Sequence, residues 1–428
     1  MRPYSDHAQK GALAIRKEVV FRRRRGYIGR RPGNRTPCKY WVREVVSERT
    51  RFAAALAAIA AVGLALFATA PRRMTEFAGD NREDYADAAD RHTLAAIFDP
   101  FLVTASPGAN TYYSPVRAAI WAAMVAACGL RPAFFCWVGV LIHLLAALLV
   151  AALARALLAS TGAALIAGLL FVGYYPSHPT PTFVAAMFSH GACVVLYLAG
   201  MLAFVRFLQG RRRRLSYGVA LAFFTLAQFT KETGWSMLPA MAALEFFVFL
   251  PPERKRPTLA NLAGFVNKYY PFFFAWLASF AIFILKYPYG SIGAEWGGAG
   301  LSINAAFRFF DMLTYMICPT IPPAMVKLAL VNATIFLFAG VAAYGSPLLR
   351  ALFFWLAAAL AAYCLADFRP IDHIVRYLYL PSAALALIVA AAAVAAWKKR
   401  RLWRWTAGGA VALALAANLA GSAQDLWR

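Results

Sequence analysis

The acidic residues of this chain gather in one short stretch. Of its 19 Asp and Glu residues, seven lie between residues 71 and 115. If the densest part of this stretch is a helix, Asp80, Asp84 and Asp87 share one face, because they follow the i, i+4, i+7 spacing of a helical surface. One interpretation is a catalytic carboxylate at the mouth of a membrane cavity, since Asp and Glu transfer protons in many enzymes. The alternative is a solvated helix in a water-facing loop.

Two more polar groups interrupt apolar segments farther along the chain. Lys231 and Glu232 stand side by side between two apolar runs, with almost no loop around them. The second group, residues 367–376, contains two acids, one histidine and two arginines. Ionisable side chains at the ends of membrane spans are costly to keep there, so they suggest a functional site. The alternative is that Lys231 and Arg376 only anchor the chain at the lipid headgroups, Lys231 while pairing with Glu232.

The composition places these groups in a membrane protein. Hydrophobic residues make up 61% of the chain, charged residues 15%, and the mean hydropathy is +0.57. These values are typical of polytopic membrane proteins and not of soluble domains. The formal net charge of +25 comes mostly from clusters beside apolar runs, at residues 22–25, 211–214, 254–256 and 398–401. Such clusters mark cytoplasmic loops, so membrane lipids are expected as partners and nucleic acid is not.

The basic clusters and the apolar runs together predict the path of the chain. Residues 1–51 carry 15 Lys and Arg against four acids, and we expect a basic cytoplasmic tail that is disordered or lies on the membrane surface. A transmembrane domain is expected at residues 52–422, with an outer loop at 71–132 that contains an interfacial helix at Val116–Leu130. All the basic clusters fall on the cytoplasmic side only if the apolar stretch Ala305–Cys318 does not cross the membrane and stays at the outer face.

This path gives an all-α protein with about eleven transmembrane spans. The N-terminus is then cytoplasmic, whereas the C-terminus, the acidic loop and residues 367–376 share the outer face. The expected spans are Phe52–Ala70, Ala133–Ala154, one starting at Ala163–Tyr174, Phe183–Leu208, Leu215–Thr230, Trp235–Leu250, Tyr269–Leu285, Val326–Tyr344, Leu348–Leu365, Tyr377–Trp397 and Thr406–Gly421.

Four short motifs give the chain a resemblance to a known family. They are Tyr113-Ser-Pro-Val, Ile142-His143-Leu-Leu, Phe229-Thr-Lys231-Glu232-Thr with Leu238-Pro239, and Arg376-Tyr-Leu-Tyr-Leu-Pro381-Ser382. In this order they resemble the GT-C membrane glycosyltransferases, and most of all the bacterial and eukaryotic relatives of the TPR-containing transmembrane O-mannosyltransferases. The resemblance covers roughly residues 80–382 and implies a GT-C-like bundle with interfacial helices in the first outer loop, which would be the catalytic loop.

The chain departs from the pattern of that family at several positions. It has Glu83-Asp84-Tyr85 where Asp-Asp is usual, and Ser114 where Arg is usual. It has Tyr175-Pro176-Ser-His178 where His-Pro-x-His is common, followed by Thr180 in place of Glu. The TPR repeats that commonly follow the last span of these relatives are not found up to Arg428. The resemblance therefore concerns the membrane domain.

The resemblance implies a catalytic carboxylate and a cationic site for phosphate. Asp84, or else Asp80, would take the proton of an acceptor hydroxyl as a general base. Arg376 and Lys231 would bind the departing phosphate, on which negative charge grows, with Arg369 in reserve. Glu232 would orient Lys231 and keep it charged. The remaining candidates are Glu83, Tyr85, Tyr377 and His178 as supporting residues, His190 as a weaker one, and His143, for which a packed, hydrogen-bonded histidine is favoured over a catalyst.

The implied activity is the transfer of a sugar from a polyprenyl-phosphate donor to an acceptor hydroxyl, with inversion, at the outer face of a bacterial inner membrane. The acceptor would be a protein or a cell-envelope glycan. The sequence has neither a Gly-rich phosphate loop nor a DxD pattern, and its six cysteines are scattered, so no required metal or other cofactor is expected. Two alternatives stay open, a non-catalytic protein of the same fold and a secondary transporter. A transporter would show an internal repeat, and none is found.

Overall fold

The computed structural model describes residues 37–70, 114–129, 131–174, 187–286, 324–364 and 375–397, with short helical pieces within 309–316 and 408–416. In these residues every regular element is a helix, and no strand is present. The prediction of an all-α protein is therefore confirmed for the described part of the chain.

The described residues form eleven α-helices. They are α2 (Pro37–Phe67), α6 (Pro115–Cys128), α7 (Pro132–Leu158), α8 (Thr161–Val172), α10 (Ala192–Leu208), α11 (Arg213–Gln228), α12 (Met237–Leu244), α13 (Leu259–Lys286), α16 (Ala324–Tyr344), α17 (Pro347–Cys364) and α18 (Tyr379–Trp397). Short 3-10 and π-helical segments join some of them: η4 (Met187–Gly191), η5 (Glu232–Ser236), η6 (Glu245–Phe249), η7 (Pro252–Lys255) and η9 (Val375–Leu378).

The first ten expected spans each overlap a helix, with three differences in detail. Helix α2 begins at Pro37, so the last part of the expected basic tail is already helical. Helix α13 begins at Leu259, earlier than expected, because the Thr258 hydroxyl accepts a hydrogen bond from the Asn261 N–H (3.3 Å) and so caps the new helix. The sixth expected span is three segments of different pitch, η5, α12 and η6.

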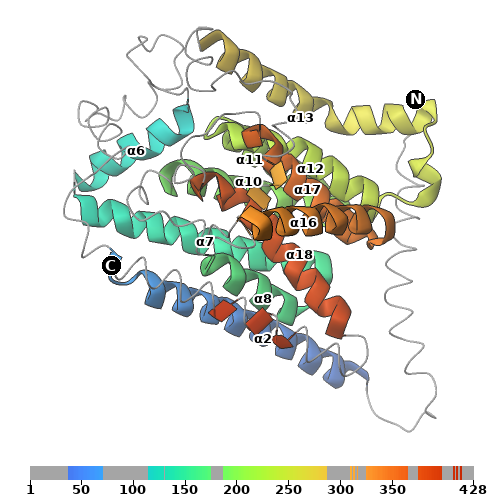
Figure 1. Cartoon of the computed structure of the whole chain (residues 1–428), viewed down its shortest axis with the longest axis horizontal. Coiled ribbons are helices and arrows are strands. Elements are labelled where there is room, and N and C mark those ends of the chain that lie inside the picture. Colours follow the sequence, from blue (N-terminus) through green and yellow to red (C-terminus); the bar gives the residue numbers. More distant parts are fainter. Residues whose placement is uncertain are drawn as a thin grey trace.

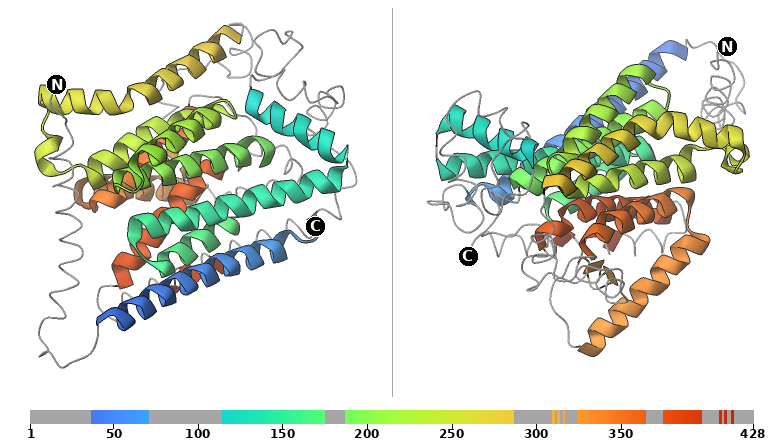
Figure 2. Two further views of the ribbon diagram at one scale, coloured as in Figure 1. Left: turned by 180° about the vertical axis from the view of Figure 1, so that it is seen from behind. Right: turned by 90° about the horizontal axis from the view of Figure 1, so that it is seen from above.

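The helices form a layered bundle with α2 at one edge and α13 at the opposite edge (Figures 1 and 2). Helix α10 packs between α7 and α11, and α18 packs against α8 and α17. Helix α16 packs against α17 and projects away from the other helices (Figure 2). Helix α6 lies at one end of the bundle beside the start of α7, where the Trp121 ring contacts the Phe135 ring with centroids 4.8 Å apart.

Four helices of the described residues are long and apolar enough to cross a membrane: Ser47–Phe67, Pro132–Leu158, Met187–Leu208 and Tyr379–Trp397. Shorter apolar helices accompany them, among them α6 and α8. Many large apolar side chains also face outward, for example Phe274 (62% exposed) and Leu262 (58%) on α13. These features support a membrane-embedded helical protein. The count of eleven spans and their orientation remain predictions.

Candidate functional site

The Lys231–Glu232 turn reverses the chain between α11 and α12 in very little space. The Lys231 N–H donates to the Ala227 carbonyl (3.2 Å), and the Gly234 N–H donates to the Lys231 carbonyl (2.9 Å). A Cβ atom at Gly234 would lie 2.7 Å from the carbonyl carbon and oxygen of Ala227, which is too close for any side chain. Gly234 is therefore what lets the turn pack onto the end of α11.

This turn holds a buried ion pair. The Lys231 Nζ lies 3.1 Å from the Glu232 Oε1, and the two side chains are only 8% and 11% exposed. The Lys231 Nζ also lies 5.9 Å from the centroid of the Tyr377 ring, within the range of a cation–π contact. The structure therefore brings together three of the sequence-predicted site residues from two distant segments.

Tyr377 joins this turn to two other parts of the bundle. Its ring meets the His190 ring edge-on, with centroids 5.0 Å apart, and the Tyr363 ring at 4.6 Å. His190 belongs to η4 and Tyr363 to α17. Arg376 precedes Tyr377 in η9, so its backbone lies directly beside the residue that contacts Lys231. The position of its side chain lies outside what the structure describes.

His143 forms a second contact between two of the sequence motifs, because it bonds to Tyr379 of the motif that begins at Arg376. Its Nε2 lies 3.1 Å from the Val172 carbonyl oxygen, and its Nδ1 lies 2.6 Å from the Tyr379 hydroxyl. A carbonyl can only accept, so Nε2 carries the proton and Nδ1 accepts from the Tyr379 O–H. Both ring nitrogens thus have partners in a fully buried position. This arrangement fits the favoured interpretation of His143 as a packed, hydrogen-bonded histidine.

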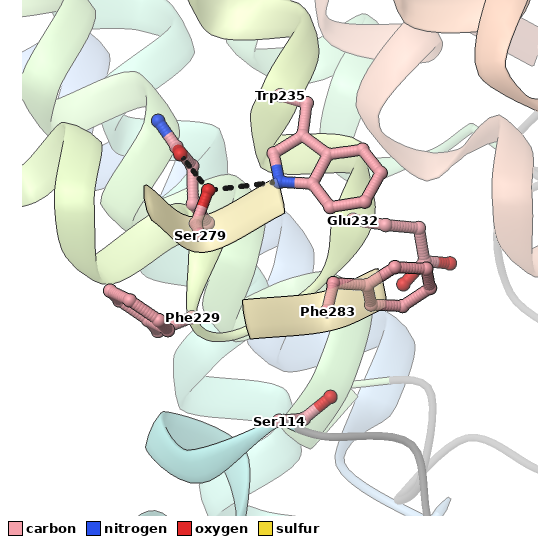
Figure 3. Close-up of a pocket in the computed structure, with 7 residues that line it drawn as sticks. Ser114, Phe229, Glu232, Trp235, Ser279 and Phe283 are labelled. Carbon is pink, nitrogen blue, oxygen red and sulfur yellow. Dashed lines mark hydrogen bonds between the residues drawn. The ribbon is translucent and has the colours of Figure 1, made fainter. Parts of the chain in front are cut away.

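A pocket opens beside the Glu232 carboxylate (Figure 3). Its enclosed space has room for about one water molecule, and the rest of its volume is open to the outside. We call it the Glu232 pocket, and its lining residues are Ser114, Gln228, Phe229, Glu232, Trp235, Ser279 and Phe283. They come from the start of α6, the end of α11, η5 and α13.

Hydrogen bonds connect the walls of the Glu232 pocket. The Val116 N–H donates to the Phe229 carbonyl (3.1 Å) and fixes the start of α6 against the turn. The Trp235 Nε1 donates to the Ser279 hydroxyl (3.2 Å), whose oxygen lies 2.5 Å from the Gln228 Oε1 (Figure 3). The Phe283 ring meets the Trp235 ring at 90°, with centroids 5.0 Å apart. Both the backbone and the side chains therefore hold the pocket in shape.

Sequence reasoning missed Gln228, Trp235 and Ser279. The only available signal was Gln228, an uncharged polar residue near the end of an apolar segment. Ser279 lies 51 residues farther along the chain, so only the packing of α13 against α11 shows that the two side chains meet.

The other predicted site residues lie outside the described residues. They are Asp80, Glu83, Asp84, Tyr85, His178 and Arg369. Two of the segments that carry them rejoin the described part at the site. The acidic loop is followed by Ser114, which lines the Glu232 pocket, and residues 367–374 are followed by η9, which carries Tyr377. The pocket and the Lys231 pair thus lie where both segments return to the bundle.

The described residues contain no group of three or more His, Cys, Asp or Glu side chains that could hold a metal ion. Arg213 lies in the first turn of α11 and Lys231 just beyond its end, so the basic cluster at residues 211–214 and the candidate site lie at opposite ends of this helix.

Comparison with protein-family models, with curated proteins and with solved structures finds no significant match to the chain.

Proposed function

We propose that the chain is an integral-membrane glycosyltransferase of the GT-C type. It transfers a sugar from a polyprenyl-phosphate donor to an acceptor hydroxyl of a protein or a cell-envelope glycan. The observation that supports this most is the buried Lys231 cation, held by the Glu232 carboxylate and next to the Tyr377 ring. A cation kept among apolar helices is costly, and the phosphate of a lipid-linked donor is an anion that such a cation stabilises.

The two ends of α11 support the proposed orientation. The basic cluster at residues 211–214 precedes the helix and Lys231 follows it. Basic loops face the cytoplasm, so the end of the bundle with Lys231 and the Glu232 pocket faces outward. Lipid-linked sugars are available there without a nucleotide, and this supports the proposal that transfer takes place at the outer face of a bacterial inner membrane.

In the proposed reaction one bond forms and one breaks at the anomeric carbon of the sugar. The acceptor oxygen bonds to this carbon while its proton passes to the carboxylate of Asp84, or else of Asp80. The bond from the carbon to the phosphate oxygen breaks, and polyprenyl phosphate leaves with an additional negative charge. Lys231 and Arg376 stabilise that charge, and Glu232 keeps the Lys231 ammonium in place.

A binding experiment tests the phosphate role of Lys231. The variant Lys231→Met in a lipid nanodisc should bind farnesyl phosphate, a short polyprenyl phosphate, about tenfold to a hundredfold more weakly than the parent, because a charge-assisted hydrogen bond is lost. Lys268→Met is the matched control, since Lys268 is the cation of another ion pair with a buried glutamate. Equal binding by the Lys231 variant and the parent would remove the main support for this function.

A transfer experiment tests the base. Polyprenyl-phosphate sugars are incubated with the protein and a cell-envelope extract, and glycosylated acceptors are identified by mass spectrometry. Asp84→Asn should lower transfer about 10²-fold or more while farnesyl phosphate binding is kept, and Asp80→Asn should cost less. If Asp80→Asn abolishes transfer and Asp84→Asn does not, the two roles are exchanged. If neither matters, the acidic loop is a solvated surface and not the catalytic loop.

A further inference from the structure

The turn between α10 and α11 has a strained backbone. It carries four consecutive arginines, residues 211–214, and all four are exposed. Arg212 has φ +40° and ψ +52°, in the left-handed region that side chains other than those of Asn and Asp seldom adopt. Gly210, at φ +74°, shows what the same turn uses where only the backbone matters. Glycine would also suit position 212 better, so the arginine there has a use that offsets the strain.

Hydrogen bonds fix the backbone of this turn and leave its charges available. The Arg211 N–H donates to the Arg206 carbonyl (2.9 Å), and the Ser216 hydroxyl donates to the Arg211 carbonyl (2.8 Å). The Gln209 side-chain amide donates to the Ala156 carbonyl (3.0 Å), which joins the turn to α7. None of the guanidinium groups of residues 211–214 forms an ion pair with a described residue. The turn is therefore built as a fixed support for exposed positive charge.

A second basic segment reaches the same end of the bundle. The start of α11 and η6 meet at Lys268, whose carbonyl accepts a hydrogen bond from Tyr217 and whose ammonium pairs with Glu245. Residues 254–256 follow η6 directly, partly in η7. Glu253 is the single acid in this segment. We call the eight Lys and Arg residues at this end the basic rim: Arg206, residues 211–214 and residues 254–256.

Apolar side chains stand exposed beside the basic rim. Leu215 follows the arginine turn directly and is 59% exposed, and Leu259, at the start of α13, is 86% exposed. Lys255 lies over the ring of Phe246, which is also exposed, with its Nζ 5.5 Å from the centroid. A soluble polyanion would leave these side chains in water. A membrane surface offers anionic headgroups to the arginines and the start of the acyl chains to the leucines.

We propose that the basic rim binds the headgroups of anionic phospholipids, with the guanidinium groups of residues 211–214 paired to headgroup phosphates. A guanidinium can donate to two phosphate oxygens at once, which a lysine cannot. A loop that only sets the orientation of the chain needs positive charge but no fixed turn. This inference does not rest on the proposed function, because Lys231 lies at the other end of α11.

Native mass spectrometry of the full chain in detergent tests the inference. Dioleoyl-phosphatidylglycerol, which is anionic, and dioleoyl-phosphatidylcholine, which is zwitterionic, are titrated separately. The parent should bind the anionic lipid at least about tenfold more tightly, and Arg211→Gln/Arg214→Gln should reduce this preference about fivefold to tenfold. Arg117→Gln/Arg131→Gln is the matched control, because it removes the same charge from the α6–α7 end of the bundle. This control should keep the preference of the parent.

Arg212→Gly separates the charge from the backbone that carries it. Glycine adopts φ +40° without strain, so the unfolding midpoint in detergent should stay within about 2 °C of the parent. The preference for phosphatidylglycerol should nevertheless fall about threefold, because one guanidinium group is lost. A purely structural role of Arg212 would give the opposite result, with a changed midpoint and an unchanged preference. This variant also serves if the double variant fails to fold.

Three results would overturn the inference. The parent could bind the two lipids equally, or the Arg117/Arg131 control could reduce the preference as much as the rim variant does. A parent without lipid preference that binds polyglutamate through Arg211 and Arg214 would instead indicate an acidic protein partner. Lys231→Met should keep the preference for phosphatidylglycerol, and its loss there would place the lipid at the candidate site. Each of these outcomes is distinct from the farnesyl phosphate test of the proposed function.

Discussion

The described residues contain two lysine–glutamate ion pairs whose carboxylate side chains are at most 11% exposed, Lys231–Glu232 and Lys268–Glu245. They lie near opposite ends of α12 and differ in what they connect. Glu245, in η6, binds the Lys268 ammonium through Oε1 and accepts a hydrogen bond from the Tyr269 hydroxyl (2.9 Å) through Oε2. The Tyr217 hydroxyl in turn donates to the Lys268 carbonyl (2.8 Å). This pair therefore fastens α13 to α11 and to the end of α12.

The ion pair between Lys231 and Glu232 is of a different kind. Its members are neighbours in the sequence, so the bond between them joins one turn to itself. Burying two charges costs several kcal/mol, and the cost is offset only when the pair gains good partners. Glu245 has such partners for both oxygens, whereas the Glu232 Oε2 has no hydrogen bond to the described residues. A pair with a carboxylate oxygen that is open to a further hydrogen bond is the better candidate for function.

The largest effect is expected at the structural pair. Glu245→Ala should lower the free energy of unfolding by about 3 kcal/mol, because it leaves Lys268 and the Tyr269 hydroxyl without their shared partner. Binding of farnesyl phosphate by the folded fraction should not change. Unfolding by a denaturing detergent, followed by tryptophan fluorescence, measures the first quantity. Unchanged stability, or weakened phosphate binding, would mean that the two pairs do not differ as described.

A reversal of charge at the candidate site should separate pairing from function. The double variant Lys231→Glu/Glu232→Lys keeps an ion pair in the turn, so its free energy of unfolding should stay within about 1 kcal/mol of the parent. Its affinity for farnesyl phosphate should fall about 10²-fold, because a carboxylate then stands beside Tyr377 where the cation was.

The same reversal at the other pair is the control. In Lys268→Glu/Glu245→Lys a longer lysine side chain replaces the carboxylate that now contacts both residue 268 and the Tyr269 hydroxyl, so this geometry is lost. This variant should lose about 1–2 kcal/mol of stability and bind farnesyl phosphate as the parent does. If instead the reversal at residues 231 and 232 changes neither the free energy of unfolding nor the affinity for farnesyl phosphate, that pair is an anchor without a role in binding.

The sequence predicted the helices well because apolar runs of sufficient length leave the chain few other structures in a membrane. It also predicted that Lys231 and Glu232 pair, since neighbouring opposite charges in a tight turn are within reach of each other. The structural pair was not predicted. Glu245 and Lys268 are 23 residues apart, on two helices whose relative position depends on packing.

The change of pitch at η6 was also missed, and so was the network of Gln228, Ser279 and Trp235 that shapes the Glu232 pocket. A π-helical turn widens the helix by one residue per hydrogen-bonded ring, and no residue type encodes it reliably. The sequence therefore located the apolar helices, though not the starts of α2 and α13, and three residues of the site, Lys231, Glu232 and Tyr377. It did not show which side chains from α13 complete the pocket.

The smallest effect is expected at the aromatic contact of the candidate site. A cation about 6 Å from a ring centroid gains roughly 0.5–1 kcal/mol, and the Lys231 Nζ lies 5.9 Å from the Tyr377 centroid. Tyr377→Phe keeps this ring and its packing on His190 and Tyr363, so its affinity for farnesyl phosphate should match that of the parent. Tyr377→Leu removes the ring and should weaken binding about twofold to fivefold, as measured by titration with farnesyl phosphate. If Tyr377→Phe weakens binding as much as Tyr377→Leu does, the Tyr377 hydroxyl and not its ring contributes to binding, and the cation–π contact with Lys231 has no role in it.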